Sequence, residues 1–540
     1  MSHPMSRRTV LRRGAQAAAA VAGGRVLSAS AARAAAPSPT VVEVPAVVVG
    51  SGYGGAVSAL RLGQAGVQTL VLEMGRSWTR PGRDGRPFCS TLRPDGRAMW
   101  MRRRTKTPLN TMYGIPIDMP IPKYAGVLDC LQHPEMAVYV GRGVGGGSLV
   151  NGGMAVTPRR EDFERFLPGV DADEMYGKYF PLANAHLKSN EVPQDWFETT
   201  PVHQFSRVGR GQAERVGYET AFVPSVYDYG YMQDEVAGHV RRSATNQEVF
   251  YGNNGGKQSL DKTYLREALA TGKVEIASLR TVTSVTRAAD GSFRLTVSQR
   301  DDYGRLLGVQ EVRCRSLFLA AGCMGTTELL LRARELGTLQ GLSGAIGQGW
   351  GNNGNVTAAR MNRFTTPTGA RQTTMPAMGI DARDHPDHRM FVEITPMPTN
   401  FENFTSCYLG VTENSERGHL RYNAQTDRAD LVWRREQGRP AVNALSNLLG
   451  AINHRERTGY RKDLYFGGRT WGDHYTWHPL GGCVLGEATD AFGRVRGGGP
   501  GLYVNDGSLI PGYASVNPFV TITALAERNI ERVLSEDRVG

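Results

Sequence analysis

The sequence predicts an α/β fold in which a Rossmann-like nucleotide-binding domain is interleaved with an α+β domain built on a large, mostly antiparallel sheet. Three patterns support this prediction. A strand, a glycine-rich turn, a helix and a second strand follow one another between Val41 and Glu73. The order strand, glycine, helix recurs over residues 316–334. Between residues 355 and 470, apolar and polar residues alternate over long runs, which is typical of half-buried strands.

The first pattern contains a dinucleotide-binding motif. Ala46–Val49 is an apolar, β-branched run fit for a buried parallel strand, and residues 50–55 read G-x-G-x-x-G. In such a motif Gly50 permits the tight turn, Gly52 lets the backbone approach a pyrophosphate, and Gly55 lets the next helix pack closely. We expect that helix over Ala56–Gln64, with its N-terminus facing the phosphates.

The second strand ends in an acidic residue at the expected distance. Thr69–Leu72 is the predicted strand, and Glu73 follows Gly55 by 18 residues, where a carboxylate would accept hydrogen bonds from an adenosine ribose. The alternative is a glycine-rich turn without a ligand. The strand before the motif, the helix after it and the acid together favour a ligand, but the motif alone does not separate FAD from NAD.

The N-terminus resembles an export leader. Arg7 and Arg8 precede an Ala-rich stretch and a small-residue exit, so residues 1–36 are predicted to be a twin-arginine signal and the protein to be secreted. The apolar run Ala15–Ala22 is too short to span a bilayer, which takes about 20 residues. The alternative is a disordered basic tail, which does not explain the order of these three features.

Composition excludes several classes of protein. The chain has 63 Lys and Arg against 51 Asp and Glu, a net charge of +12, and six of the arginines lie in residues 1–36. The remaining +6 is scattered, so we expect no nucleic-acid partner. No other segment approaches 18 consecutive apolar residues, and we therefore expect a soluble mature protein. The six cysteines have no metal-ligand spacing, so no metal is expected, and their pairing stays open.

Two glycine-containing regions are expected to cover the ligand. Arg76–Met136 is irregular and is predicted to form loops or a lid. Gly141–Met154 is too glycine-rich for a helix or a central strand, and bare backbone of this kind can lie against a flat ligand. A flexible linker is the alternative, but Leu149, Val150 and Met154 are more apolar than linkers usually are. We favour contact with a flavin.

The middle of the chain predicts further elements by period. A helix is expected over Ser259–Leu269 and another over Thr326–Arg334. The expected strands are Lys273–Ile276, Thr281–Arg287, Phe293–Arg300, Val309–Cys314, Ser316–Ala321, Met390–Thr395, Thr405–Val411 and a hairpin within Gly418–Arg434. Turns at residues 290–291 and 303–304 indicate an antiparallel meander of the three strands from Thr281 to Cys314. Ser316–Ala321 is expected to return to the sheet that begins at residue 46.

One acid and one histidine are candidates for chemistry. Glu393 lies among Phe391 and Val392, so it is either a solvated residue of an alternating strand or a carboxylate beside an apolar ligand with a raised pKa. The local sequence favours the first reading. His478 lies in a turn shaped by proline and glycine. Asn517 precedes Pro518 and is predicted to cap a helix that runs to about residue 534 and lends positive potential to a reduced flavin.

Several long motifs resemble those of one family. They are GSGYGGAVSALRL with Glu73, VGRGVGGGSLVNGGMAV, YGNNGGKQSLDKTYL, HPLGGCVLG and NDGSLIPGYASVNPFVTITALAERN. Together they are similar to the glucose–methanol–choline (GMC) oxidoreductases, and within that family they resemble the secreted bacterial cholesterol oxidases that hold FAD without a covalent bond. The similarity covers essentially the whole chain after the leader. Trp477, where a tyrosine is expected, and the glycine-rich turn Arg496–Gly501 depart from the pattern.

The resemblance implies a role for individual residues. Besides the motif glycines, FAD would contact Tyr53, Gly54, Glu73, Gly147, Asn151, Gly152, Met154, Val282, Gly507, Asn517 and Phe519. His478 would hydrogen-bond a steroid 3β-hydroxyl, Asn517 would orient the substrate and tune the flavin, and Glu393 would move a proton from C4 to C6. The FAD-binding domain would comprise residues 41–154, 271–354 and 476–540, and the substrate domain residues 155–270 and 355–475.

The implied activity is oxidation of a 3β-hydroxysteroid such as cholesterol by O2, with release of H2O2 and isomerisation of the Δ5-3-ketone to the Δ4-3-ketone. Two alternatives stay open. One is a related alcohol oxidase or dehydrogenase with a non-steroid substrate. The other is a secreted sterol-binding flavoprotein without turnover. A monomer is expected, with transient contact to sterol-containing membranes.

Overall fold

A computed structural model describes residues 41–107, 111–112, 115–116, 118–246, 248–386, 389–397, 403–465 and 468–539. The predicted leader, residues 1–36, lies outside this part of the chain. The described residues belong to one compact unit, Thr40–Gly540, so the two-domain division stays a prediction. Among them, no helix combines the length and apolar character needed to cross a membrane. Their cysteines form no disulfide with one another.

A five-stranded parallel sheet contains the two strands on either side of the predicted dinucleotide motif. Its order is β22 (Leu502–Val504), β13 (Ser316–Leu319), β2 (Ala46–Val49), β3 (Thr69–Leu72) and β9 (Val274–Ala277). All four pairings are parallel, and the predicted return to the first strand is confirmed, with Ser316 opposite Ala46. β2, β3 and β13 are completely buried, as their apolar runs predict.

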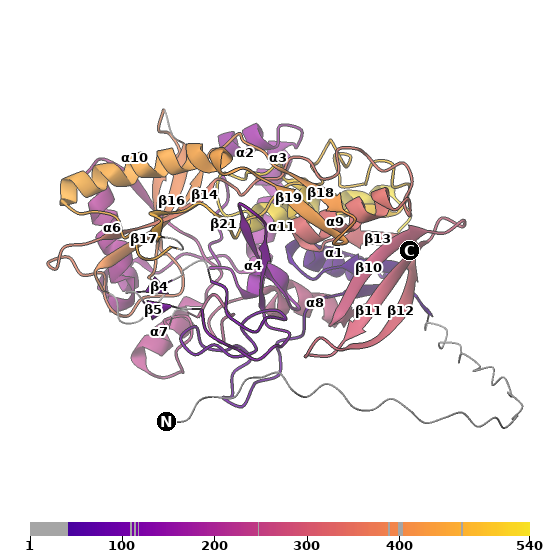
Figure 1. Cartoon of the computed structure of the whole chain (residues 1–540), viewed down its shortest axis with the longest axis horizontal. Helices are drawn as coiled ribbons and strands as arrows, with labels where there is room; N and C mark the ends of the chain where they lie inside the picture. Colours follow the sequence, from indigo (N-terminus) through magenta and orange to yellow (C-terminus); the bar gives the residue numbers. More distant parts are fainter. Residues whose placement is uncertain are drawn as a thin grey trace, which may run out of the picture. The chain divides into compact units, whose positions relative to one another are not determined.

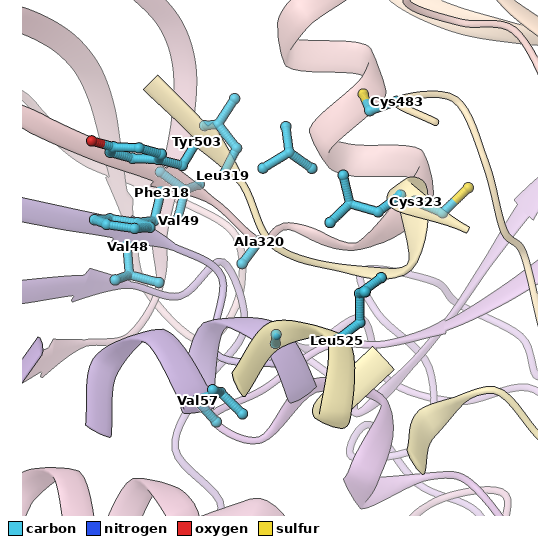
Figure 2. Packing of buried hydrophobic residues seen from close by; sticks show 14 of the residues in the cluster. Val48, Val49, Val57, Phe318, Leu319, Ala320, Cys323, Cys483, Tyr503 and Leu525 are labelled. Carbon is cyan, nitrogen blue, oxygen red and sulfur yellow. The ribbon is translucent and has the colours of Figure 1, made fainter. Parts of the chain in front are cut away.

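Four helices pack around this sheet, namely α1 (Tyr53–Gln64), α8 (Tyr264–Ala270), α9 (Gly322–Glu335) and α11 (Phe519–Glu536). α1 contacts both α8 and α11. Figure 2 shows the packing: Val48, Phe318 and Tyr503 from three neighbouring strands lie one above another, with Val57 of α1 below them. The rings of Phe318 and Tyr503 stack at 4.6 Å. This core holds the carboxyl ends of the strands in place.

The predicted meander is confirmed as a separate sheet. β10 (Arg280–Arg287), β11 (Phe293–Arg300) and β12 (Leu306–Cys314) are antiparallel neighbours, and β1 (Val41–Glu43) joins β12 in parallel.

A second large sheet is six-stranded and wholly antiparallel. Its order is β20 (Trp471–Gly472), β14 (Asn355–Met361), β17 (Thr405–Thr412), β16 (Met390–Thr395), β15 (Met378–Ala382) and β8 (Glu219–Phe222). The long helix α10 (Arg439–Glu456) lies across its strands (Figure 1). The predicted hairpin forms a sheet of its own, β18 (His419–Asn423) with β19 (Arg428–Val432).

The prediction of loops over Arg76–Met136 is wrong in part. β6 (Leu128–Gln132) lies within it and forms a three-stranded sheet with β7 (Ala137–Gly141) and β21 (Tyr475–Thr476). β21 pairs in parallel with β7, so a strand contributed by the C-terminal part of the chain stabilises β6 and β7. Two short strands, β4 (Thr111–Met112) and β5 (Ile115–Pro116), also fall here.

The remaining helices are short. They are α2 (Arg160–Phe166), α3 (Ala172–Glu174), η2 (Met175–Tyr179), α4 (Phe180–Leu187), α5 (Gln194–Thr199), η3 (Pro201–His203), α6 (Gln204–Glu214), α7 (Tyr229–Ala237), η5 (Arg435–Gly438) and η7 (Gly507–Leu509). The helix predicted over Ser259–Leu269 is two pieces, η4 (Leu260–Lys262) and α8, because Thr263 between them has a non-helical backbone. Gly141–Met154, predicted to be irregular, contains one 3₁₀ turn, η1 (Gly146–Leu149).

Asn517 does not cap α11 as predicted. The helix begins at Phe519 with Pro518 in the cap position, and no side chain caps it. The Oδ1 of Asn517 has no hydrogen-bond partner among the described residues. The amide is turned toward Glu393 instead of the helix N-terminus, as the site below shows.

Candidate active site

One cavity of about 1330 Å³ collects nearly all the residues predicted to bind the cofactor. Its lining includes Gly50, Gly52, Tyr53, Gly54, Glu73, Gly147, Asn151, Gly152, Met154, Val282, Gly507, Asn517 and Phe519, together with His478. Gly55 is absent from this lining because it lies within α1, packed against the turn. Glu393 is also absent from it. The structure therefore brings residues from four distant stretches of chain to one site.

The turn after β2 has the shape that a dinucleotide requires. Gly50 has a φ of +97°, and a Cβ on it would overlap the carbonyl of Ala320. A Cβ on Gly52 would meet no protein atom within 4 Å. Gly52 also begins α1 without a side-chain cap, so the first N–H groups of this helix are available to a phosphate. A Cβ on Gly55 would overlap the carbonyl of Gly50, which explains the close packing of α1. The residues present thus fit a bound dinucleotide.

Glu73 is buried and already holds the turn together. Its Oε2 accepts hydrogen bonds from the backbone N–H and the hydroxyl of Ser51, at 3.1 and 2.6 Å, and its Oε1 accepts one from the N–H of Gly75 at 2.7 Å. Each carboxylate oxygen can accept more than one bond, so a ribose hydroxyl can still be accommodated. The sequence reasoning missed Ser51, a variable position of the glycine motif.

The glycine-rich loop forms a second open surface in the cavity. A Cβ on Gly147 would meet no protein atom within 4 Å, which leaves room for a flat ligand against the backbone. The Nδ2 of Asn151 donates to the hydroxyl of Tyr53 at 2.6 Å, and the rings of Tyr53 and Phe519 stack at 4.9 Å. Lys257 is buried and donates to the carbonyl of Asn151, so it fixes the loop from behind.

His478 lies just after β21, and the end of that strand positions it. Its backbone N–H donates to the hydroxyl of Thr476 at 3.0 Å. Its Nδ1 lies 3.4 Å from the Nδ2 of Asn353, a residue that the sequence reasoning missed. Burial lowers the pKa of His478 to about 4, so the imidazole is neutral at pH 7. The signal that could have found Asn353 is the stretch Gly-Asn-Asn-Gly-Asn at residues 351–355.

Glu393 is fully buried on β16. It pairs with Leu409 of β17, and Leu409 and Thr395, on the same face of the sheet, both line the cavity. Neither carboxyl oxygen has a hydrogen bond of normal geometry among the described residues. Burial raises the pKa of Glu393 to about 8, and the amide of Asn517 opposes this rise only in part. Asn517 therefore links Glu393 to the cavity, and the alternative of a solvated Glu393 is wrong.

An aromatic wall borders His478. The ring of Trp477 contacts three other aromatic rings. It stacks on Phe250 with ring centroids 5.6 Å apart and lies tilted against Tyr139 at 4.6 Å. The ring of Tyr475 stands nearly perpendicular to it at 6.0 Å. All four rings line the cavity. They come from the loop before residue 251, from β7 and from β21, and the sequence reasoning singled out only Trp477.

Comparison with known proteins agrees with this geometry. The model described as GMC oxidoreductase matches residues 119–334, and the model described as GMC oxidoreductase, C-terminal, matches residues 353–466. Together these matches span more than half of the chain. The chain belongs to the GMC oxidoreductase family. Members of this family depend on FAD, so this GMC oxidoreductase is an alcohol-oxidising flavoprotein. The cavity is therefore the candidate site for FAD and for the alcohol substrate.

Curated relatives extend over most of this GMC oxidoreductase. A cholesterol oxidase of Mycobacterium tuberculosis is 24% identical over 555 residues, which cover 89% of each chain. An uncharacterized GMC-type oxidoreductase of Sinorhizobium fredii is 25% identical over 92% of this chain and 95% of its own. A cholesterol oxidase of Acinetobacter baumannii is 24% identical over 56% of this chain.

Solved structures share the fold. Pyridoxine 4-oxidase from Mesorbium loti superposes with a TM-score of 0.59 at 15% identity, and a fungal aryl-alcohol oxidase with a TM-score of 0.61 at 14% identity. They cover 92% and 91% of this chain, and 100% and 99% of their own. The predicted α/β class and its mostly antiparallel second sheet are confirmed.

Proposed function

We propose that this GMC oxidoreductase oxidises a 3β-hydroxysteroid such as cholesterol with O2, releases H2O2, and converts the Δ5-3-ketone to the Δ4-3-ketone. The observation that carries the proposal is the buried, unpaired carboxyl group of Glu393, joined through Asn517 to the cavity that His478 lines. Oxidation of an alcohol needs a polar group at the hydroxyl, which His478 can supply from the cavity surface. An isomerisation that moves a proton from C4 to C6 needs in addition a carboxyl group buried beside the apolar ring system.

His478 and Asn517 serve the oxidation step. FAD, held without a covalent bond, supplies the hydride acceptor and the site of reaction with O2. A neutral His478 at the cavity surface can hydrogen-bond the substrate hydroxyl and fix the carbinol carbon toward the flavin ring. Asn517 lines the same cavity as His478 and acts on Glu393, so its amide can orient the same substrate oxygen.

Glu393 serves the isomerisation step. Once C3 is a ketone, the carbonyl acidifies the protons on C4, and a base must take one and return it to C6. A carboxylate with a pKa near 8 is a stronger base than one in water, and when protonated it is a ready donor. Phe391, Val392 and Ile394 around it are buried, which excludes water that would exchange the proton.

Two relatives in fold are named for other alcohols, pyridoxine and aryl alcohols. The aromatic wall of Phe250, Trp477 and Tyr139 gives this second candidate an observation of its own, because flat aromatic substrates also stack on such a surface. Oxidation of an aryl alcohol includes no isomerisation step that would use Glu393. A sterol-binding flavoprotein without turnover would need neither His478 nor Glu393.

The test separates the two chemical steps. Purified Glu393→Gln should reduce its flavin and release peroxide with cholesterol while the Δ5-3-ketone accumulates, because the amide keeps the shape and loses the proton carrier. Chromatography and the absorbance of the conjugated enone measure the products, and a peroxide assay measures turnover. A wild-type ratio of Δ4 product to peroxide would refute the role of Glu393. Wild-type enzyme that oxidises benzyl alcohol and not cholesterol would favour the aryl-alcohol alternative.

A further inference from the structure

Asn353 contacts both His478 and the segment that leads to Asn517. It is fully buried, and three partners surround its side chain. Its Oδ1 accepts a hydrogen bond from the backbone N–H of Ala514 at 2.8 Å. Its Nδ2 donates to the backbone carbonyl of Val516 at 2.9 Å and lies 3.4 Å from the Nδ1 of His478.

These partners fix which way the amide points. A backbone N–H can only donate and a backbone carbonyl can only accept, so the oxygen of Asn353 must face Ala514 and its nitrogen must face Val516. The second hydrogen of that nitrogen then points at His478. The Nδ1 of His478 must accept it, and a neutral imidazole with an accepting Nδ1 carries its proton on Nε2.

The backbone at Asn353 gives an independent reason to look for a function. Its φ is +59°, in the left-handed region, where a residue without a Cβ is the least strained. Gly351 and Gly354 stand on either side of the Asn pair, so this stretch readily accepts glycine. An asparagine at this position, with both polar atoms of its side chain hydrogen-bonded, indicates that the side-chain amide has a function of its own.

We propose that Asn353 is the positioning residue that holds His478 in the tautomer with its proton on Nε2, so that His478 meets the substrate as a hydrogen-bond donor. The assignment rests on the proposed contact of His478 with the substrate hydroxyl. The hydrogen bonds of Asn353 tie the orientation of His478 to backbone residues 514–516, which directly precede Asn517. His478 therefore does not take the hydroxyl proton, which passes to bulk water and is balanced by the proton that O2 takes up when it is reduced to H2O2.

No charge opposes this arrangement. Burial is the influence that acts on the pKa of His478, with no contribution from a charged side chain among the described residues. Glu393 reaches the site through the neutral amide of Asn517. A neutral donor in the position of Asn353 is thus enough to select the tautomer.

Asn353→Asp is the diagnostic variant. Its carboxylate cannot donate, so it favours a proton on Nδ1 and raises the pKa of His478. Below that raised pKa the imidazolium still donates from Nε2. Above it the neutral ring offers an accepting Nε2, and kcat/KM should fall by roughly 10²-fold, the loss of a positioned proton-bearing group. The expected signature is a new basic limb in the pH profile of kcat/KM with cholesterol.

Two further variants separate this effect from loss of structure. Asn353→Gly suits the left-handed backbone and should fold and retain FAD, yet lose roughly tenfold in kcat/KM without a basic limb. Asn352→Asp places a carboxylate one residue away, where the side chain accepts from the N–H of Gly354 and does not contact His478, so no basic limb should appear. An Asn353→Asp profile matching the wild type, or an unchanged kcat/KM in Asn353→Gly, would overturn the proposal.

The tautomer can also be observed without a substrate. In the holoenzyme labelled with ¹⁵N-histidine, the His478 signal, assigned by its loss in His478→Gln, should show an unprotonated Nδ1 and a protonated Nε2 at pH 7. The opposite pattern would overturn the proposal. Wild-type turnover in His478→Ala would instead refute the proposed contact of His478 with the substrate and leave the observed tautomer intact, so the two failures are distinguishable.

Discussion

Replacing Glu393 with glutamine should stabilise the protein at neutral and alkaline pH. The carboxyl group is fully buried and its pKa is raised from 4.5 to about 8, mainly by burial. In the unfolded chain it loses its proton near pH 4.5, whereas in the folded protein it keeps the proton up to about pH 8. Between these values the folded state binds more protons, so the free energy of unfolding falls as the pH rises.

The size of this effect follows from the shift. At pH 7 the wild type has lost roughly 3.5 kcal/mol through this group, from 2.5 pH units at about 1.4 kcal/mol each. Glutamine has a similar shape and does not titrate, so Glu393→Gln should avoid the loss. The variant should melt at nearly the wild-type temperature at pH 5 and at a clearly higher one at pH 8.

Differential scanning calorimetry of the two holoenzymes across this pH range tests the prediction. Glu235→Gln is the matched control, because Glu235 is also buried but accepts hydrogen bonds from the N–H groups of Ser243, Ala244 and Thr245. An amide there would turn an NH₂ toward a donor, so Glu235→Gln should melt lower at every pH. A Glu393→Gln protein that melts at or below the wild type at pH 8 would refute the reasoning.

Three other predictions concern the glycine turn, the aromatic wall and a buried histidine outside the cavity lining. Gly52→Val should fold but purify without FAD, because a Cβ at this position meets no protein atom within 4 Å and the side chain would occupy the phosphate position. Flavin absorbance of the purified protein measures this. Gly54→Ala should not fold, because its Cβ would overlap the carbonyl of Asn505. Stoichiometric FAD in Gly52→Val would contradict this placement. Trp477→Ala should keep FAD and raise the KM for cholesterol roughly tenfold by removing the centre of the aromatic wall, whereas an unchanged KM would take Trp477 out of the substrate contact. His203 is fully buried, neither of its ring nitrogens has a hydrogen-bond partner among the described residues, and burial lowers its pKa to about 3. The unfolded chain binds a proton there below pH 6.5, so stability falls as the pH drops, by roughly 2 kcal/mol at pH 5. Between pH 7 and pH 5 the melting temperature of His203→Phe should therefore fall less than that of the wild type. An equal fall would contradict the prediction.

The local sequence pattern was enough to predict the strands that consist of one short, buried apolar run or that are joined by recognisable turns. β2, β3 and β13 are short apolar runs next to glycines, and the meander of β10, β11 and β12 has turn residues at both bends. β6 and β21 were not predicted, because each is stabilised by a partner from a distant part of the chain. The cap at Asn517 was predicted wrongly for a related reason, since its amide lies beside a buried carboxyl of the six-stranded sheet, far away in the sequence.

The candidate site shows the same limit. The glycines of the nucleotide motif can be recognised locally, because they stand at a fixed spacing between a buried strand and a helix. The burial of Glu393 depends on the whole six-stranded sheet and on Asn517, and its local sequence favours a solvated residue. Asn353 contributes through two backbone partners more than 150 residues away, which no spacing in the sequence reveals.

The order of synthesis of this chain sets when it can acquire its cofactor. β2 and its glycine turn leave the ribosome early, but β22, which completes the sheet, follows more than 450 residues later. Gly54 packs directly against the backbone of Asn505, so the glycine motif is shaped for a segment that does not yet exist when the motif emerges. The binding site of the nascent chain therefore stays incomplete until β22 has been synthesised, and strand pairing over such a separation is slow. Any product truncated before β22 lacks the strand that completes the sheet, so flavin incorporation reports that translation has passed this strand.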